Sequence, residues 1–132
     1  MSMRYYTYEA YGLVLSEDTM KLICEKAFAE DPVEDGDYGF ALYEAGICEL
    51  VGDFTGELST ITDEGRDIWG KAETIDDSLF YIPVKKYPSL FKTAYNNMDE
   101  LVAEFKEALG EYLPADFDYR SNIRHIVGTT FG

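Results

Sequence analysis

The sequence predicts an α+β fold, with a mostly antiparallel sheet of about five strands packed against two main helices. Two segments have apolar residues at helical spacing, and several short runs are rich in β-branched and aromatic residues. The predicted order is β-α-β-β-β-β-α-β, with a block of successive strands between the helices. That order favours hairpins and antiparallel pairing, and a ferredoxin-like arrangement is one candidate topology.

The chain length fits a single domain covering residues 1–132, because a second core would be too small to be stable. Hydrophobic residues make up 46% of the chain and aromatic residues 15%, so we expect a packed core despite the net charge of −15. Two cysteines, Cys24 and Cys48, do not make a disulfide framework. The start lacks an apolar run of signal-peptide length, and no stretch approaches the roughly 20 residues of a membrane span. These features predict a cytoplasmic protein.

The first third of the chain reads as strand, helix and loop. Residues 4–15 are rich in aromatic and β-branched side chains and predict a strand. Ser16 is a suitable N-cap for a helix over 17–29. The stretch 30–37 contains five carboxylates with Pro and Gly, which predicts a loop. The apolar stripe of the helix consists of Met20, Ile23, Cys24, Ala27 and Phe28.

The middle of the chain predicts several strands. Residues 38–44, 47–54 and 57–62 have strand-like composition and are separated by Ala-Gly and Thr-Gly pairs, which suggests a meander. Residues 63–78 show no sustained period and predict a long, partly ordered connection.

The sequence predicts where two residues in or near this connection lie in the fold. Trp69 is expected to anchor the connection on the core, because a Trp side chain buries a large area. Residues 79–85 predict the next strand, and Pro83 inside it indicates an edge position, because proline has no amide donor.

The C-terminal third predicts a helix and a closing strand. A short helix over 88–95 can begin at Pro88, and Asn97 with Glu100 matches a capping box. Residues 123–131 read as the last strand. The main helix of this part presents one apolar face, formed by Met98, Leu101, Val102, Phe105, Ala108, Leu109 and Tyr112.

Residue types that catalyse reactions are sparse, so we expect no enzyme, no cofactor and no metal site. His125 is the only histidine, and it is expected on the same strand face as Ile123 and Val127 in a structural or surface role. One histidine and two distant cysteines do not match a zinc site, and no phosphate-binding loop occurs. The acidic loop lacks the alternating ligands of a calcium-binding EF-hand.

The last helix has a row of carboxylates opposite its apolar face, formed by Glu100, Glu104, Glu107 and Glu111. At 100° per residue these four fall within about 60° of arc, and successive members lie roughly 4.5–6 Å apart along the axis. That spacing is comparable with the separation of phosphates along a nucleic-acid strand. A helix selected only for stability would alternate Glu with Lys, so the row predicts a binding face.

Two further sets of acids are candidate partner-binding residues. If residues 47–61 are extended, Glu49, Asp53 and Glu57 share one face, while Cys48, Leu50, Phe54 and Leu58 share the other. The loop adds Asp31, Glu34, Asp35 and Asp37.

An excess of 26 acidic over 11 basic residues repels nucleic acid and anionic membranes and attracts basic protein surfaces. In size and charge the chain is similar to phage-encoded anti-restriction and anti-CRISPR inhibitors, although this likeness covers no motif. It implies a non-catalytic nucleic-acid mimic that occupies the basic groove of a nucleic-acid-binding effector or nuclease.

Two alternatives remain open. One is an interaction subunit or homodimer that uses the N-terminal tyrosines Tyr5, Tyr6, Tyr8 and Tyr11, since tyrosine is enriched in interfaces. The other is a carboxylate enzyme or cation-binding protein with an acidic pocket.

Overall fold

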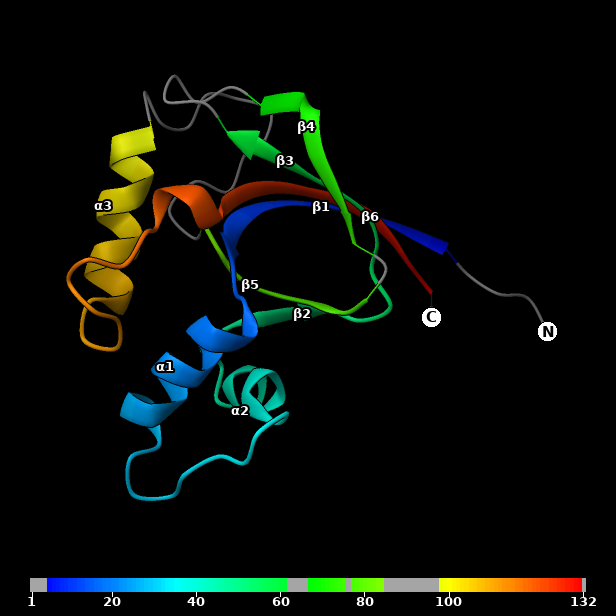
Figure 1. Ribbon diagram of the computed structural model, residues 1–132. Coiled ribbons are helices and arrows are strands. Elements are labelled where there is room, and N and C mark those ends of the chain that lie inside the picture. Colours follow the sequence, from blue (N-terminus) through cyan, green and yellow to red (C-terminus); the bar gives the residue numbers. More distant parts are fainter. Residues whose placement is uncertain (1–4, 62–66, 76, 85–97, 132) are drawn as a thin grey trace.

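The computed structural model describes residues 5–61, 67–75, 77–84 and 98–131. Over these residues the chain forms an α+β domain, which confirms the predicted class (Figure 1). The α-helices are α1 (Glu17–Ala27), α2 (Tyr38–Glu44) and α3 (Met98–Leu109), and a 3₁₀ turn, η1, covers Arg120–Asn122. The strands are β1 (Tyr5–Val14), β2 (Glu49–Val51), β3 (Thr55–Ile61), β4 (Asp67–Ile75), β5 (Leu79–Pro83) and β6 (Ile123–Phe131).

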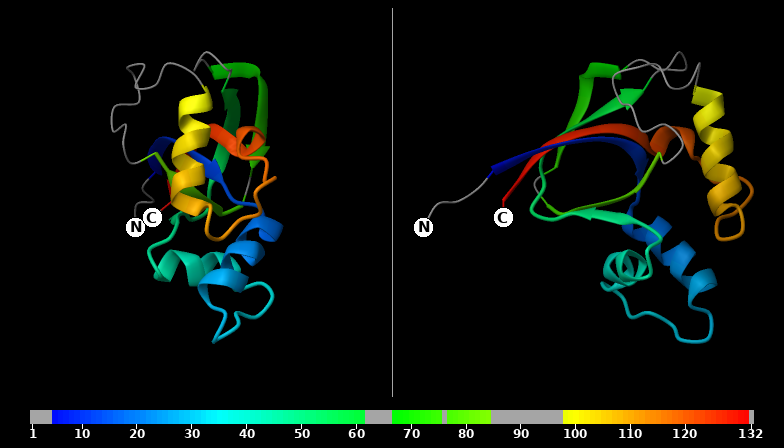
Figure 2. Two further views of the ribbon diagram at one scale, coloured as in Figure 1. Left: turned by 90° about the vertical axis from the view of Figure 1, so that its left-hand side faces the viewer. Right: turned by 180° about the vertical axis from the view of Figure 1, so that it is seen from behind.

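The strands form a 6-stranded sheet in the order β2-β5-β1-β6-β3-β4, and neighbouring strands are antiparallel. The sheet is strongly curved, with β2 and β5 below the central pair β1–β6 in Figure 1 and β3 and β4 above it. Figure 2 shows the same curvature from two other sides. This order differs from the β-α-β-β-α-β unit of a ferredoxin-like fold.

Buried side chains form one cluster on each face of the sheet, because side chains alternate along a strand. The larger cluster joins the sheet to the helices through Leu13, Ile23, Leu42, Leu101 and Ile123, each fully buried. The smaller cluster covers the other face and includes Phe54, Leu58, Tyr81 and Ile126. Adjacent residues of one strand, such as Leu13 and Val14, therefore belong to different clusters.

The predicted first strand, first helix, acidic loop and last strand are confirmed. Ser16 caps α1, since its Oγ accepts a hydrogen bond from the backbone N–H of Thr19 at 3.2 Å. The helix ends at Ala27, two residues before the predicted end. The predicted helix over 88–95 and the Asn97 cap lie outside the described residues.

The prediction of a strand over residues 38–44 is wrong, because this segment forms α2. Its aromatic residues have high strand propensity, but tertiary packing overrides propensity in so short a segment. Tyr38, Gly39 and Leu42 are buried at helical spacing. A Cβ at Gly39 would lie 2.5 Å from a ring atom of Phe80, so glycine allows the close approach of α2 to β5.

Residues 63–78 were expected to be a connection, but most of them form the edge strand β4. Its pairing with β3 shifts register between Leu58 and Thr60, and an irregular edge strand does not need strict apolar alternation. Trp69 belongs to β4. Its side chain lies outside the part that the structure describes, so its expected packing on the core stays a prediction.

The edge position expected for the strand containing Pro83 is also wrong, since β5 lies between β2 and β1. The hydrogen bonds from Leu15 N to Phe80 O and from Val84 N to Tyr11 O show which residues of β5 face β1. By alternation the nitrogen of Pro83 points to the other side. There β2 begins only at Glu49, opposite Tyr81, so the missing donor breaks no ladder bond.

Replacing Gly128 with Ala is expected to destabilise the protein by about 1–3 kcal/mol, as overpacked cores do. A Cβ there would overlap the ring of Phe54, which is 0% exposed and has no room to move. Urea unfolding measures the loss. Gly52→Ala is the matched control, because a Cβ at Gly52 meets nothing within 4 Å. Equal stability of both variants would contradict the packing described for β6.

Candidate functional site

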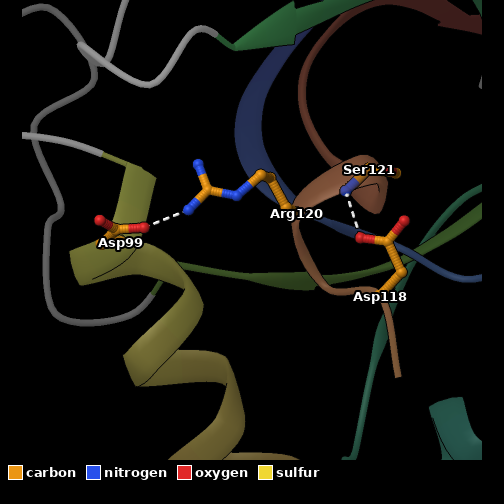
Figure 3. A network of polar contacts seen from close by, with 4 residues as sticks. All are labelled: Asp99, Asp118, Arg120 and Ser121. Atoms are coloured by element: carbon orange, nitrogen blue, oxygen red, sulfur yellow. Dashed lines mark hydrogen bonds and ion pairs between the residues drawn. The ribbon is translucent and has the colours of Figure 1, made fainter. Parts of the chain in front are cut away.

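The start of α3 is held against the 3₁₀ turn that precedes β6. The guanidinium of Arg120 forms an ion pair with Asp99 in the first turn of α3 (Figure 3). Asp118 accepts a hydrogen bond from the backbone N–H of Ser121 at 3.1 Å, and the hydrogen bonds from Ser121 lower the pKa of this carboxyl. These contacts, with the buried residues of α3, determine which side of the helix faces solvent.

The predicted glutamate row lies on the solvent side of α3. Its apolar residues Met98, Leu101, Phe105 and Leu109 are buried, as predicted. Glu107 is exposed, and Glu100 and Glu104 are half-buried. Glu111 follows the end of the helix in a turn and is exposed. The structure thus places three members of the row on α3 and the fourth just beyond it.

Three of these glutamates border an apolar groove between α3 and β5. The groove has a volume of about 630 Å³. Glu104, Glu107 and Glu111 line it on the α3 side. Most of the remaining lining is apolar and comes from Ile47, Ile82, Pro83, Val84, Phe105, Ala108, Leu109 and Tyr112.

The groove combines negative charge with apolar surface. The hydrogen bond to Glu111 raises the pKa of the Tyr112 hydroxyl, so this phenol stays protonated as a donor to the carboxylate. Apolar walls suit aliphatic or aromatic groups, and the neighbouring carboxylates suit ammonium or guanidinium groups. Among the lining residues that the structure describes, none is a Cys, His, Lys or Ser that would serve as an activated nucleophile.

The expected common face of Glu49, Asp53 and Glu57 is wrong. Glu49 lies opposite Tyr81, which belongs to the smaller cluster, whereas Glu57 lies opposite Val127 on the face of His125. The two glutamates therefore point to opposite faces. The strand assumed to be continuous is interrupted at Asp53, which has a φ of 50°, and β2 and β3 pair with different strands.

The acids of the loop form a separate set. Asp31, Glu34, Asp35 and Asp37 are exposed between α1 and α2, in the segment drawn at the bottom of Figure 1. Asp35 accepts a hydrogen bond from the Tyr38 hydroxyl, which raises the pKa of Tyr38 to about 12. The structure does not bring this loop onto α3, so the predicted partner-binding residues occupy several surfaces.

A polar cluster that composition did not reveal lies at the centre of the sheet. His125 is 4% exposed, and its Nε2 lies 2.8 Å from Oε1 of Glu9 on the neighbouring strand. The ring of Tyr11 stacks on the imidazole at 4.4 Å. Ser59 lies opposite His125 on β3 and is fully buried. His125 and Ser59 are buried, whereas the Glu9 side chain is 32% exposed, so the cluster reaches from the interior of the sheet to its surface. Only the pairing of β1, β3 and β6 reveals the cluster, since its members are far apart in sequence.

The described residues contain no candidate metal site and no candidate membrane-spanning helix. Among them, no group of three or more His, Cys, Asp or Glu side chains is placed to hold a metal ion. The helices of this part are also too short or too polar to cross a bilayer.

No protein-family model, curated protein or solved structure matches this chain. The functional argument therefore depends on the chemistry of its own surfaces.

The two cysteines are expected to be poorly reactive in the folded protein. Burial raises the pKa of the Cys48 thiol to about 12 and also raises the pKa of Cys24. Against an ordinary cysteine pKa of about 8.5, this lowers the thiolate fraction of Cys48 at pH 8 roughly a thousandfold. Alkylation by iodoacetamide, followed by mass spectrometry, should be slow in buffer and fast in urea. Equally fast labelling in both would show that the thiols are accessible.

Proposed function

We propose that this chain is a non-catalytic acidic binding protein that occupies a basic, nucleic-acid-binding surface of a partner protein and thereby inhibits it. One observation carries the proposal: Glu104, Glu107 and Glu111 gather from α3 and its following turn on one side of a single groove. The net charge of −15 adds a long-range field that attracts a basic partner.

The spacing of these carboxylates supports a mimic of a polyanion. Along a helix axis, three or four residues correspond to roughly 4.5–6 Å, which is close to the phosphate spacing of one strand. A row of carboxylates at this spacing can therefore meet lysines and arginines that otherwise contact phosphates. The apolar groove next to the row adds contact area that a phosphate backbone lacks.

Affinity capture identifies the partner. We expect a bacterial lysate passed over the immobilised protein at low salt to yield a nucleic-acid-binding protein that elutes with added salt. Duplex DNA or RNA should displace it, because both compete for the same basic groove. Retention of the captured protein in excess nucleic acid would refute the mimicry.

Charge reversal tests the row itself. Replacing Glu100, Glu104, Glu107 and Glu111 with Lys should weaken binding to the captured protein by at least a hundredfold, because attraction becomes repulsion at the contact. Titration calorimetry at fixed salt measures the change. The control variant reverses four exposed acids elsewhere, namely Glu25, Glu30, Asp77 and Asp116, and has the same net charge. Equal losses in both variants would mean that only net charge matters and would remove α3 from the site.

A second candidate function is self-association through β1. Among the described residues, β5 pairs with β1 only at Gly12–Val14, whereas β6 pairs with it from Tyr5 to Leu13. Tyr5 and Tyr6 next to this backbone are 61% and 49% exposed. A second copy of the chain can add its own β1 along that edge as an antiparallel strand.

Strand addition makes a prediction that separates it from charge mimicry. A β1–β1 dimer should persist in 1 M salt, since its contacts are backbone hydrogen bonds and tyrosine packing. Thr7→Pro should dissociate it, because odd-numbered residues of β1 direct their amides to the β5 side. Light scattering measures the mass of both. A monomer at millimolar concentration in wild-type protein would eliminate this function.

A further inference from the structure

The outward face of α2 is aromatic. Phe40 and Tyr43 are 54% and 46% exposed, and they are neighbours because residues three apart lie side by side on a helix. The opposite side of the helix is already filled by Tyr38, Gly39 and Leu42, which are buried. This short helix therefore presents large apolar side chains on both sides, which a helix that only covers the core does not need.

Phe40, one of these two aromatic residues, is held in place by the fold. The ring of Phe40 packs edge-on against Phe80 of β5, with centroids 5.4 Å apart and an interplanar angle of 85°. Gly39 lies against the same Phe80 ring, since a Cβ there would be 2.5 Å from a ring atom. Because the core fixes the position of Phe40, a ligand that stacks on it loses little entropy in ordering the protein side.

Two carboxylates fall on the same side of α2 as this aromatic pair. Glu44 lies four residues after Phe40 and Asp37 three residues before it, so at 100° per residue both fall on the outward side of α2. Both are exposed. The sequence contains no Lys or Arg between Lys26 and Arg66, so no cation of this segment neutralises them.

We propose that this face of α2 binds an arginine side chain of a basic protein partner. A guanidinium group stacks on aromatic rings and donates several hydrogen bonds in its plane, so it can contact Phe40, Tyr43 and a carboxylate together. Lysine offers a point charge without the planar stacking surface. The inference rests on the proposed function for the basic partner, but it uses a different surface from the glutamate row of α3.

The probe is a capped peptide in which three arginines alternate with glycine, compared with its lysine equivalent. We expect the arginine peptide to shift the backbone amide NMR signals of Phe40, Tyr43 and Glu44 selectively at low salt. Its affinity should exceed that of the lysine peptide severalfold. Tyr43→Ser should weaken binding about 2-fold to 5-fold, the usual effect of one exposed cation–π contact.

Controls separate recognition from folding and from charge. Tyr6→Ser removes an aromatic side chain that is also exposed, and it should leave peptide affinity unchanged. Urea unfolding of Tyr43→Ser should match wild type, because this side chain projects outward. The variant with the reversed glutamate row on α3 should retain the α2 shifts. Equal affinity for both peptides, or unchanged affinity after Tyr43→Ser, would overturn the arginine site and leave the α3 proposal standing.

Discussion

The fold depends on the pairing of its first strand with its last. β1 and β6 are antiparallel neighbours from Tyr5 opposite Phe131 to Leu13 opposite Ile123, in one continuous register. This pair occupies the middle of the sheet, with β5 on one side and β3 on the other. Both clusters of buried side chains include residues of these strands, so neither core can form without the pair. Pairing the two end strands is entropically costly, because it closes a loop that contains most of the sequence.

The central pair also explains the buried polar group. Register places Glu9 beside His125 and Tyr11 opposite it, and Ser59 follows from the pairing of β3 with β6. Burying an imidazole is costly unless it has partners, and here Glu9 and the ring of Tyr11 provide them. The serine, histidine and glutamate of this cluster are thus brought together by the register of the sheet.

The acidic surface is organised by the helices. Each helix buries one side, and the exposed side that remains carries a glutamate row on α3 and an aromatic face beside carboxylates on α2. The charges are therefore displayed in separate groups rather than in one continuous stripe. Under the proposed function, a partner that contacts both helices needs a broad basic surface, as a nucleic-acid-binding groove provides.

Local pattern alone determined several features of this protein. The amphipathic stripe of α3, the Ser16 cap of α1 and the strands β1 and β6 follow from side chains a few residues apart, and the interactions that select them are equally local. Glu100, Glu104 and Glu107 of the glutamate row belong to this group, since helical spacing by itself puts them on one side of α3.

Tertiary structure decided the rest. Residues 38–44 form a helix that buries Tyr38, Gly39 and Leu42, and its close approach to Phe80, distant in sequence, depends on the missing Cβ of Gly39. Glu49 and Glu57 lie on opposite faces because β2 and β3 pair with different strands in opposite halves of the sheet. The groove beside α3 requires β5, which no periodicity in α3 can specify. In each case the deciding contact joins segments far apart in the chain. A local sequence pattern does not specify which distant segment packs against it.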